Sequence, residues 1–256
     1  FQPDPRFASN YSDVEKKSLA AFATQIEGMD KSLGDILDHL EKLGVAENTL
    51  VMFLGDNGTD GPIGGTHDVS CAAPLRGKKA THYEGGMRVP FIAAWAKPDS
   101  DNEFQKRMPI AQNAITEQLG AVYDLFPTVL AAAGGALPES KMDGVDLLPF
   151  FAPDSAAAER DFLMHFPHGH RSSYFTAYRK GDWKLVYHYR HTAKAKWEPI
   201  ELFNLASDPY ESKNLAKSNS AKLEEMLKSM NAALADCNAQ FPLADDKETL
   251  LKPSAR

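Results

Sequence analysis

The chain has 256 residues, of which 43% are hydrophobic and 25% charged, a composition typical of globular proteins with a substantial apolar core. Its formal net charge of −7 indicates no basic face, so we expect no nucleic-acid partner. The longest apolar runs, such as residues 49–54 and 89–94, fall far short of the ~18 residues that a membrane span requires, so no span is expected. Two cysteines, Cys71 and Cys237, cannot form a disulfide scaffold or a cysteine zinc site.

The N-terminal part of the chain predicts one long helix. Residues 1–12 are polar and carry two prolines, and they are expected to form an extended lead-in. Over residues 14–43, apolar side chains recur at spacings of three and four, the period of an amphipathic helix. Asp13 is a plausible N-cap of this helix, and Gly44 is a plausible stop beyond its C-terminal end.

Two short apolar segments predict the strands of an α/β domain. Residues 49–54 form a continuous apolar run, typical of a strand that is buried on both faces of a parallel sheet. Residues 89–95 are expected to form the next strand, and an amphipathic pattern over residues 118–133 predicts a second helix. A helix that leads into a buried strand favours an α/β layered domain, which we place at residues 1–150.

The C-terminal part, residues 151–256, has a different character and predicts a small antiparallel sheet with a closing helix. Gly181 and Asp182 form a hairpin signal between two of the expected strands. Strands are expected at residues 161–166, 175–179, 183–188 and 202–205, and the closing helix is expected at residues 221–235.

The glycine-rich stretch between the first two predicted strands holds the candidate site. In Gly55-Asp56-Asn57-Gly58, the acid and the amide offer hard oxygen ligands, which suit Ca²⁺ or Mg²⁺ better than zinc. Long loops after a buried strand often carry function, because ligands bind beyond the carboxyl ends of parallel strands. The same tetrapeptide is also compatible with an Asx turn that closes a strand.

A second segment, residues 74–90 (PLRGKKATHYEGGMRVP), places four cations, one glutamate and three glycines around a turn. Such a segment can position a lysine and an arginine beside a tetrahedral anion. With a metal ion on the opposite side, an ammonium group would polarise the same oxyanion. A solvated charged loop is the alternative interpretation.

These two segments together resemble the sulfatases of the alkaline phosphatase superfamily. The family pattern is a strand that ends in Ser/Gly-Asp-Asn-Gly, followed by a segment like P-L-R-G-G-K-G-T-x-Y-E-G-G-x-R-V-P. The chain departs from it at Lys78 and Ala80, where glycines are usual. Residues 179–186 and 201–215 also resemble the C-terminal subdomain of the family, so the resemblance extends over nearly the whole chain. The matching positions of the second segment are Pro74, Leu75, Arg76, Gly77, Lys79, Thr81, Tyr83, Glu84, Gly85, Gly86, Arg88, Val89 and Pro90.

The resemblance implies hydrolysis of sulfate esters by an α/β fold: part of a large mixed or parallel sheet flanked by helices, followed by the small antiparallel subdomain. It implies that Asp56 and Asn57 are two ligands of one divalent cation, Ca²⁺ or alternatively Mg²⁺. It further implies that Lys79 is a catalytic residue that contacts the sulfate and stabilises charge on its oxygens. Three other charged residues of the segment are expected to brace the loop by ion pairs: Arg76, Glu84 and Arg88.

Four histidines are candidates for contact with the substrate, which would be a sulfated small molecule or saccharide. His168 and His170 lie where many members of the family place a substrate-facing loop, and His67 and His82 could also face the site. Each of these histidines could equally belong to an ordinary polar loop. Sulfatases are often exported, so a periplasmic, secreted or lysosomal location follows only by analogy.

The nucleophile of the family is missing from the sequence. It is a formylglycine made from the cysteine of Cys-x-Pro/Ala-x-Arg, and the nearest approach here places Arg76 five residues after Cys71. We therefore interpret Cys71 as a structural or bystander thiol, and we interpret Cys237 as buried apolar filler. The upstream aspartates that complete the metal site in the family are also absent.

We therefore expect this chain to be the C-terminal half of a sulfatase, whose N-terminal segment holds the formylglycine and the remaining metal ligands. On that interpretation, the isolated chain is inactive, binds the cation weakly and leaves apolar faces uncovered. Two alternatives stay open. One is a phosphodiesterase or phosphonate monoester hydrolase of the same superfamily, and the other is a non-catalytic remnant that binds sulfated ligands.

Overall fold

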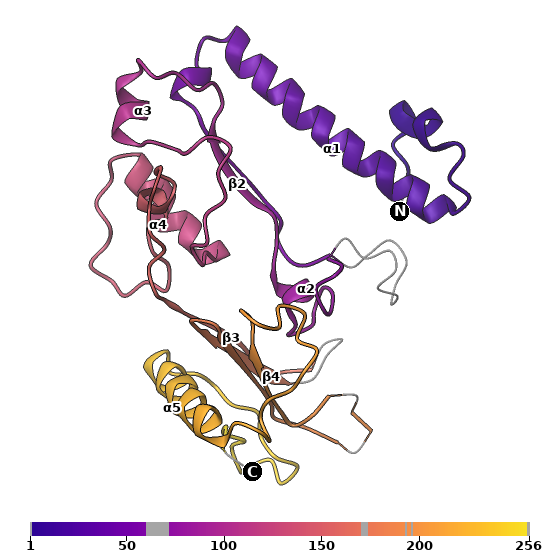
Figure 1. Ribbon diagram of the computed structural model, residues 1–256, viewed down its shortest axis with the longest axis vertical. Helices are drawn as coiled ribbons and strands as arrows, with labels where there is room; N and C mark the ends of the chain where they lie inside the picture. The colour runs from indigo at the N-terminus through magenta and orange to yellow at the C-terminus, as the bar shows by residue number, and fades with distance from the viewer. Residues whose placement is uncertain (1, 60–71, 170–173, 193, 196, 255–256) are drawn as a thin grey trace. The chain divides into compact units, whose positions relative to one another are not determined.

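The computed structural model describes residues 2–59, 72–169, 174–192, 194–195 and 197–254 (Figure 1). The chain divides into two compact units. Unit 1 comprises Phe1–Asp56 and Val89–Ala158, and unit 2 comprises Asn57–Arg88 and Glu159–Arg256. The segment that links the two strands of unit 1 therefore belongs to unit 2. A domain boundary near residue 150 stays a prediction.

Unit 1 begins with a 3-10 helix, η1 (Pro5–Tyr11), that packs along the long helix α1 (Lys17–Lys42) (Figure 1). The expectation of an extended lead-in over residues 1–12 was therefore wrong. The physical reason is local: the side chain of Asp4 caps the first turn by accepting a backbone hydrogen bond, and a proline follows it at the first helical position. α1 begins later than expected, and Gly44, with φ of +70°, follows its C-terminal end as predicted.

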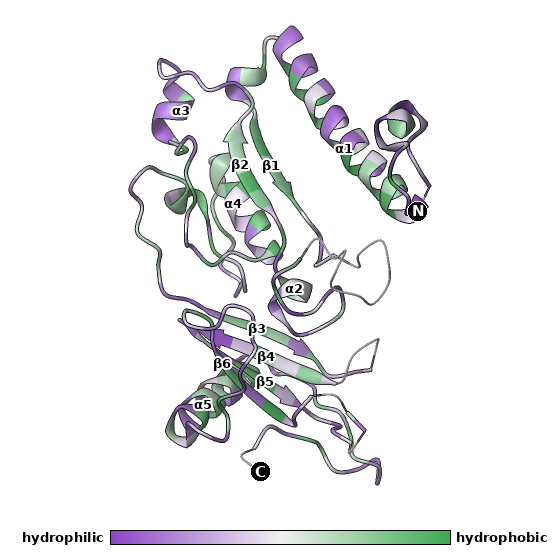
Figure 2. Ribbon diagram, turned by 45° about the vertical axis from the view of Figure 1, so that its right-hand side comes forward, coloured by the Kyte–Doolittle hydropathy of each residue, from purple (hydrophilic) through white to green (hydrophobic). Residues whose placement is uncertain are grey.

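The strands β1 (Leu50–Leu54) and β2 (Phe91–Trp95) form the sheet of unit 1. They pair antiparallel, with Met52 opposite Ala93, whereas the apolar run of β1 favoured a parallel pairing. An apolar run indicates that both faces of a strand are apolar, but it does not indicate the direction of the neighbouring strand. Both strands are rich in hydrophobic residues (Figure 2), yet β1 is only half-buried and Trp95 is the sole fully buried residue of β2. The predicted α/β class is confirmed.

The remaining elements of unit 1 are short. The helix expected over residues 118–133 begins only at Leu125, because Asp124 uses its carboxylate to hold the backbone N–H groups of Ala121 and Val145. These bonds keep the chain before Val122 out of the helix. The short elements are η2 (Ala46–Asn48), α3 (Glu103–Arg107), η4 (Val122–Asp124), α4 (Leu125–Ala132) and η5 (Leu148–Phe150).

Unit 2 contains a four-stranded antiparallel sheet with the order β3-β4-β5-β6. The expected hairpin turn is confirmed at Gly181, whose φ is +54°. The helix α5 (Ser220–Asp236), capped by Asn219, packs on one face of the sheet (Figures 1 and 2). Together these elements confirm the predicted antiparallel sheet with a closing helix. The strands are β3 (Asp161–Phe166), β4 (Phe175–Lys180), β5 (Trp183–His188) and β6 (Ile200–Asn204).

The two faces of this sheet differ in chemistry because side chains alternate along each strand. On the face toward α5, Leu185 and Leu202 lie opposite each other in a fully buried apolar core. The other face carries Phe175, Ala177 and Val186 together with three buried polar side chains: Lys184, His188 and Glu201. Residues 72–88 of unit 2, which include α2 (Glu84–Met87), pack against this second face through Tyr83 and Met87. Among the described residues, no helix is both long and apolar enough to cross a membrane.

Candidate functional site

The motif at residues 74–88 folds as a tight turn followed by α2. Gly77 has φ of +86°, and a Cβ atom at Gly86 would collide with the carbonyl oxygen of Lys78. Both positions therefore require glycine if the turn is to close. Ala80 has φ of +68°, so alanine stands in a left-handed conformation at one of the two places where the family has glycine.

Glu201 of β6 is the centre of the first buried polar cluster. The hydroxyl of Tyr83 donates to its Oε1 at 3.0 Å, and Nε2 of His188 lies 3.0 Å from its Oε2. Nε2 of His82 lies 3.2 Å from the same Oε2, and the guanidinium of Arg76 lies 3.8 Å from Oε1. The side chains of His82, His188 and Glu201 are all less than 5% exposed. This cluster fastens the motif turn to β5 and β6.

Lys184 of β5 is the centre of the second cluster. Its ammonium group lies 2.8 Å from a carboxylate oxygen of Glu84 and 2.7 Å from one of Glu211. Glu84 also accepts a hydrogen bond from Arg88 at 2.6 Å, and its own backbone N–H donates to Glu211 at 2.7 Å. Two cations thus face two carboxylates, and three of these four side chains are buried. A buried charge needs such partners to offset its loss of hydration.

Arg76 joins the two clusters. Besides approaching Glu201, its guanidinium donates to the carbonyl oxygen of Glu211 at 2.8 Å and lies 3.8 Å from the centre of the Tyr83 ring. The expectation that Arg76, Glu84 and Arg88 brace the loop by ion pairs is therefore confirmed.

Sequence reasoning missed the partners of these residues on the sheet, which are Lys184, His188, Glu201 and Glu211. A signal was present in the strand sequences WKLVYH and IELFN. In both, the residue two positions after the charged one is apolar or aromatic, Val186 after Lys184 and Phe203 after Glu201, which indicates that the face with the charge is itself buried.

Burial sets the protonation state of the first cluster. It lowers the pKa of His82 to about 4 and also lowers the pKa of His188. Burial by itself raises the pKa of Glu201, but the close imidazoles of His188 and His82 outweigh it and bring that pKa down to about 2. At neutral pH, therefore, a carboxylate lies between two neutral imidazoles.

Lys79, the predicted sulfate-binding residue, lies on the motif turn between Arg76 and Glu84, which are both held by ion pairs. Its backbone N–H donates to the carbonyl oxygen of Thr59 at 2.9 Å, and its side chain is half-buried. Within the described part of the chain, its ammonium group is in no ion pair, whereas Arg76, Arg88 and Lys184 are each held by carboxylates. Its catalytic role stays a prediction.

Asp56 and Asn57, the predicted metal ligands, follow β1 after a single glycine, and both are exposed. The backbone N–H of Gly58, the next residue in the sequence, donates to the carbonyl oxygen of Gly86 at 3.1 Å. This bond connects the start of the loop to the motif turn. The donor chemistry fits a hard cation, because a carboxylate and a carboxamide supply oxygen atoms. Two such oxygens fall short of the six to eight that Ca²⁺ takes.

The predicted substrate histidines lie in different surroundings. His168 is exposed next to β3, where its ring packs at 4.1 Å from that of Phe166. His67 and His170 lie outside the described residues, as does Cys71. His82 is buried in the Glu201 cluster, and its role toward substrate stays a prediction. Cys237 was expected to be buried and is instead exposed, because it lies just beyond the end of α5.

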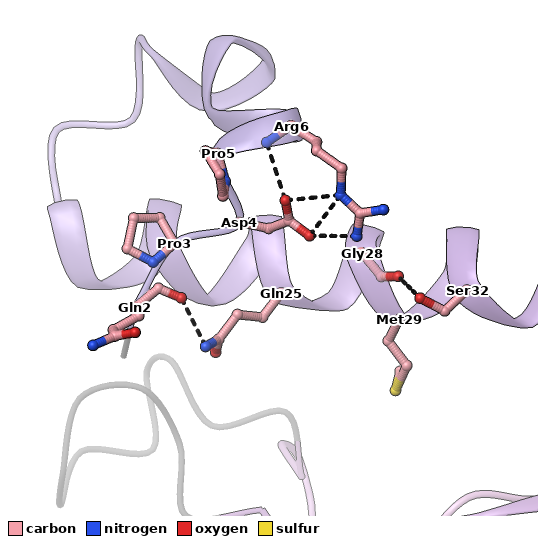
Figure 3. Close-up of a pocket in the computed structure, with 9 residues that line it drawn as sticks. All are labelled: Gln2, Pro3, Asp4, Pro5, Arg6, Gln25, Gly28, Met29 and Ser32. Atoms are coloured by element: carbon pink, nitrogen blue, oxygen red, sulfur yellow. Dashed lines mark hydrogen bonds and ion pairs between the residues drawn. The ribbon is translucent and has the colours of Figure 1, made fainter.

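A surface hollow in unit 1 is lined by none of the predicted site residues. It has a volume of about 690 Å³ and is lined by the N-terminal segment and by one face of α1 (Figure 3). The Asp4–Arg6 ion pair, at 2.7 Å, already neutralises both of the charges that line it. The hollow therefore offers no unpaired charge to an anionic ligand.

Comparisons with known proteins agree with the motif. The Sulfatase family model matches residues 1–136, and a second model, described as N-sulphoglucosamine sulphohydrolase, C-terminal, matches residues 78–240. The first match covers more than half of the chain. The chain therefore belongs to the sulfatase family.

Curated relatives match nearly the whole chain but extend well beyond it. Mouse steryl-sulfatase is 28% identical over 95% of this chain and 40% of its own length. A sulfatase of Formosa agariphila is 32% identical over 84% of this chain and 40% of its own, and human arylsulfatase A is 27% identical over 88% and 45%. The chain thus spans less than half the length of these relatives.

Solved structures show the same fold. The crystal structure of Ps i-CgsB superposes with a TM-score of 0.67 at 23% identity, over 91% of this chain and 46% of that one. BT4656, solved in complex with its substrate D-glucosamine-2-N,6-O-disulfate, gives a TM-score of 0.62 at 21% identity, over 91% and 45%. At these identities, the likeness supports the fold and not the substrate.

Proposed function

We propose that the intact protein that contains this chain hydrolyses sulfate esters, and that this chain supplies the sulfate-binding lysine and two oxygen ligands of the metal site. Membership of the sulfatase family supports the reaction class. The local structure supports the assignment of Lys79, which is the observation that carries the proposal.

Lys79 differs from Arg76 and Arg88 in its charge partners. Arg76 and Arg88 are committed to carboxylates, and those ion pairs hold the turn in place. Lys79 sits on the same turn with its backbone anchored to Thr59 and with its ammonium in no ion pair among the described residues. A fixed, unneutralised ammonium group can stabilise the negative charge that develops on sulfate oxygens during hydrolysis.

Asp56 and Asn57 would hold the divalent cation, Ca²⁺ or Mg²⁺, through their side-chain oxygens. Such a cation supplies positive charge that polarises the sulfate. Because two ligands do not complete a coordination shell, we propose that the remaining ligands come from a segment outside these 256 residues. We propose the same for the formylglycine nucleophile, since the sequence contains no Cys-x-Pro/Ala-x-Arg. The chain on its own is then inactive.

The substrate class that we propose is a sulfated small molecule or saccharide, contacted by His168 and His170. His168 is exposed and can reach a ligand, and one solved relative binds a sulfated glucosamine. The exposed imidazole offers a hydrogen bond to a sugar hydroxyl or to a sulfate oxygen.

The test uses the intact protein and two adjacent lysines. Lys79→Ala is expected to lower kcat/KM for an aryl sulfate by about 100-fold or more, the range seen when one stabilising donor is removed. Lys78→Ala is the matched control, because it removes the same charge one residue away, and it should stay within about threefold of wild type. An equal loss in both variants would show that only the overall charge of the turn matters.

Assays with an aryl phosphate on the same proteins separate the reaction classes. A higher kcat/KM for the phosphate than for the sulfate would replace the sulfatase proposal with a phosphatase or phosphodiesterase of the same superfamily. No hydrolysis of either ester by the intact protein would leave a binding module.

A further inference from the structure

His82, His188 and Glu201 form a compact set of metal-ligand side chains inside unit 2. One ligand atom from each lies within 4.8 Å of the other two. The imidazole Nε2 atoms of His82 and His188 lie 3.2 Å and 3.0 Å from the same oxygen, Oε2 of Glu201. The residues come from three separate elements, the motif turn, β5 and β6, and converge on one point.

The hydrogen bonding of this set is incomplete. Neither ring nitrogen of His82 makes a hydrogen bond of good geometry to any described residue, although the side chain is only 2% exposed. A neutral imidazole has one donor and one acceptor nitrogen, and buried polar atoms of this kind almost always have a partner. Nε2 of His82 has only the contact with Glu201 at 3.2 Å, and an ion bound there would give this nitrogen a partner.

We propose that His82, His188 and Glu201 bind a transition-metal dication of the zinc type. Two imidazole nitrogens and one carboxylate oxygen are a known zinc donor set, whereas Ca²⁺ and Mg²⁺ prefer oxygen ligands alone. With metal–ligand bonds of about 2.0–2.1 Å, the ligand atoms of a tetrahedral site lie roughly 3.3 Å apart. The two observed nitrogen–oxygen distances, 3.2 Å and 3.0 Å, are close to that value. The three ligand atoms lie within 4.8 Å of one another, so the two imidazoles would move toward each other around an ion.

The surroundings agree with an enclosed site. The hydroxyl of Tyr83 donates to the two oxygens of Glu201 at 3.0 Å and 3.2 Å and so orients this carboxylate, and a water would supply the fourth ligand. The ring of Trp197 stacks on His188 at 5.6 Å and closes the site with an aromatic wall. Arg76, 3.8 Å from the carboxylate, opposes a dication, but its side chain is 36% exposed and its charge is therefore screened by water.

The function of such an ion follows from the elements that it joins. It would lock the turn that carries Lys79 onto β5 and β6, in place of the proton that otherwise lies between His188 and Glu201. This site is separate from the oxygen ligands Asp56 and Asn57, and it does not depend on the proposed sulfatase activity.

The test uses Co²⁺, a spectroscopic substitute for zinc. The intact protein is expressed in a medium whose only added transition metal is cobalt, because buried ligands load most readily during folding. We expect one cobalt per chain and the intense visible absorption of a tetrahedral ion. X-ray absorption should show two imidazole ligands. Less than a tenth of an ion per chain, or an all-oxygen shell, would overturn the proposal.

Four variants locate the ion. His82→Gln and His188→Gln should each reduce the cobalt content at least tenfold, the scale expected when a metal site loses an essential group. His39→Gln, an exposed histidine of α1, is the matched control and should retain the ion. Asp56→Asn should also retain it, even where sulfate ester hydrolysis is lost. Retention in both cluster variants, or loss only in Asp56→Asn, would contradict the site. If a cluster variant fails to fold, the wild-type ligand shell decides.

Discussion

The two units of the chain differ in how they bury apolar side chains. Of the 21 buried apolar residues that the structure describes, only Ala21, Ala46, Trp95 and Leu147 belong to unit 1. Of the 18 large apolar side chains that are exposed, all but Tyr210, Leu243 and Leu250 belong to unit 1. Unit 2 therefore contains a core of its own, whereas unit 1 exposes the residues from which a core would be made.

This difference indicates which unit can fold without further packing. Unit 2 has a four-stranded sheet with α5 on one face and the motif segment on the other, so both faces are covered. Unit 1 has a two-stranded sheet, which is marginally stable in water without further packing. We therefore propose that the N-terminal sulfatase segment expected from the sequence covers the apolar side chains of α1, β2 and α4.

The largest predicted effect probes the buried charges that distinguish unit 2. Lys184→Met leaves the carboxylates of Glu84 and Glu211 without their shared cation and should lower the free energy of unfolding by about 3–5 kcal/mol. Urea unfolding of the intact protein measures this change. Lys180→Met, at an exposed position of β4, is the control and should change the same quantity by less than about 0.5 kcal/mol. Equal effects in the two variants would show that Glu84 and Glu211 are not left as uncompensated buried charges when Lys184 is removed.

A pair of methionines compares the two units directly. Met230 of α5 is fully buried in the core of unit 2, and Met230→Ala should cost about 2–5 kcal/mol of stability in urea unfolding. Met29 of α1 is 46% exposed in unit 1. If that face stays in water, Met29→Ala should cost less than about 0.5 kcal/mol.

The outcome at Met29 decides how the exposed face of α1 is used. A loss of more than about 2 kcal/mol in the intact protein would mean that this side chain is covered there, since only a buried methionine carries such a value. A negligible loss would contradict the proposal that a further segment packs on α1.

Local patterns predicted unit 2 better than unit 1. The bounds of β4 and β5 agree with the expected ranges to within one residue, because the turn at Gly181 defines the hairpin that joins them without help from distant residues. In unit 1, the second helix begins seven residues later than expected, at Leu125. Its start is set by bonds from Asp124 to Ala121 and to Val145, and the latter lies 21 residues along the chain.

The candidate site was predictable only in part, for a similar reason. The turn motif identified Lys79, Asp56 and Asn57 through the family resemblance. It could not identify Lys184 as the partner of Glu84. The two residues are 100 positions apart, and the sequence around one does not predict contact with the other. Charges on strands are expected to face water, and only a second packed segment turns them into buried ion pairs.

The smallest predicted effect concerns the motif turn, where unit 2 departs from its family. Ala80 has φ of +68°, a conformation that disfavours a Cβ atom by about 1–2 kcal/mol, while glycine adopts it freely. Part of that gain is offset by the greater freedom of glycine in the unfolded chain, so Ala80→Gly should raise stability by about 0.5–1 kcal/mol. Ala232→Gly, at an exposed position inside α5, is the matched control and should lower stability by about 1 kcal/mol, because it exchanges the same residues within a helix. Stability changes of opposite sign in the two variants, measured by thermal unfolding, would show that alanine strains the turn. Equal losses would mean that the left-handed conformation at residue 80 is not maintained, and the anchoring of Lys79 by the turn would have to be reconsidered.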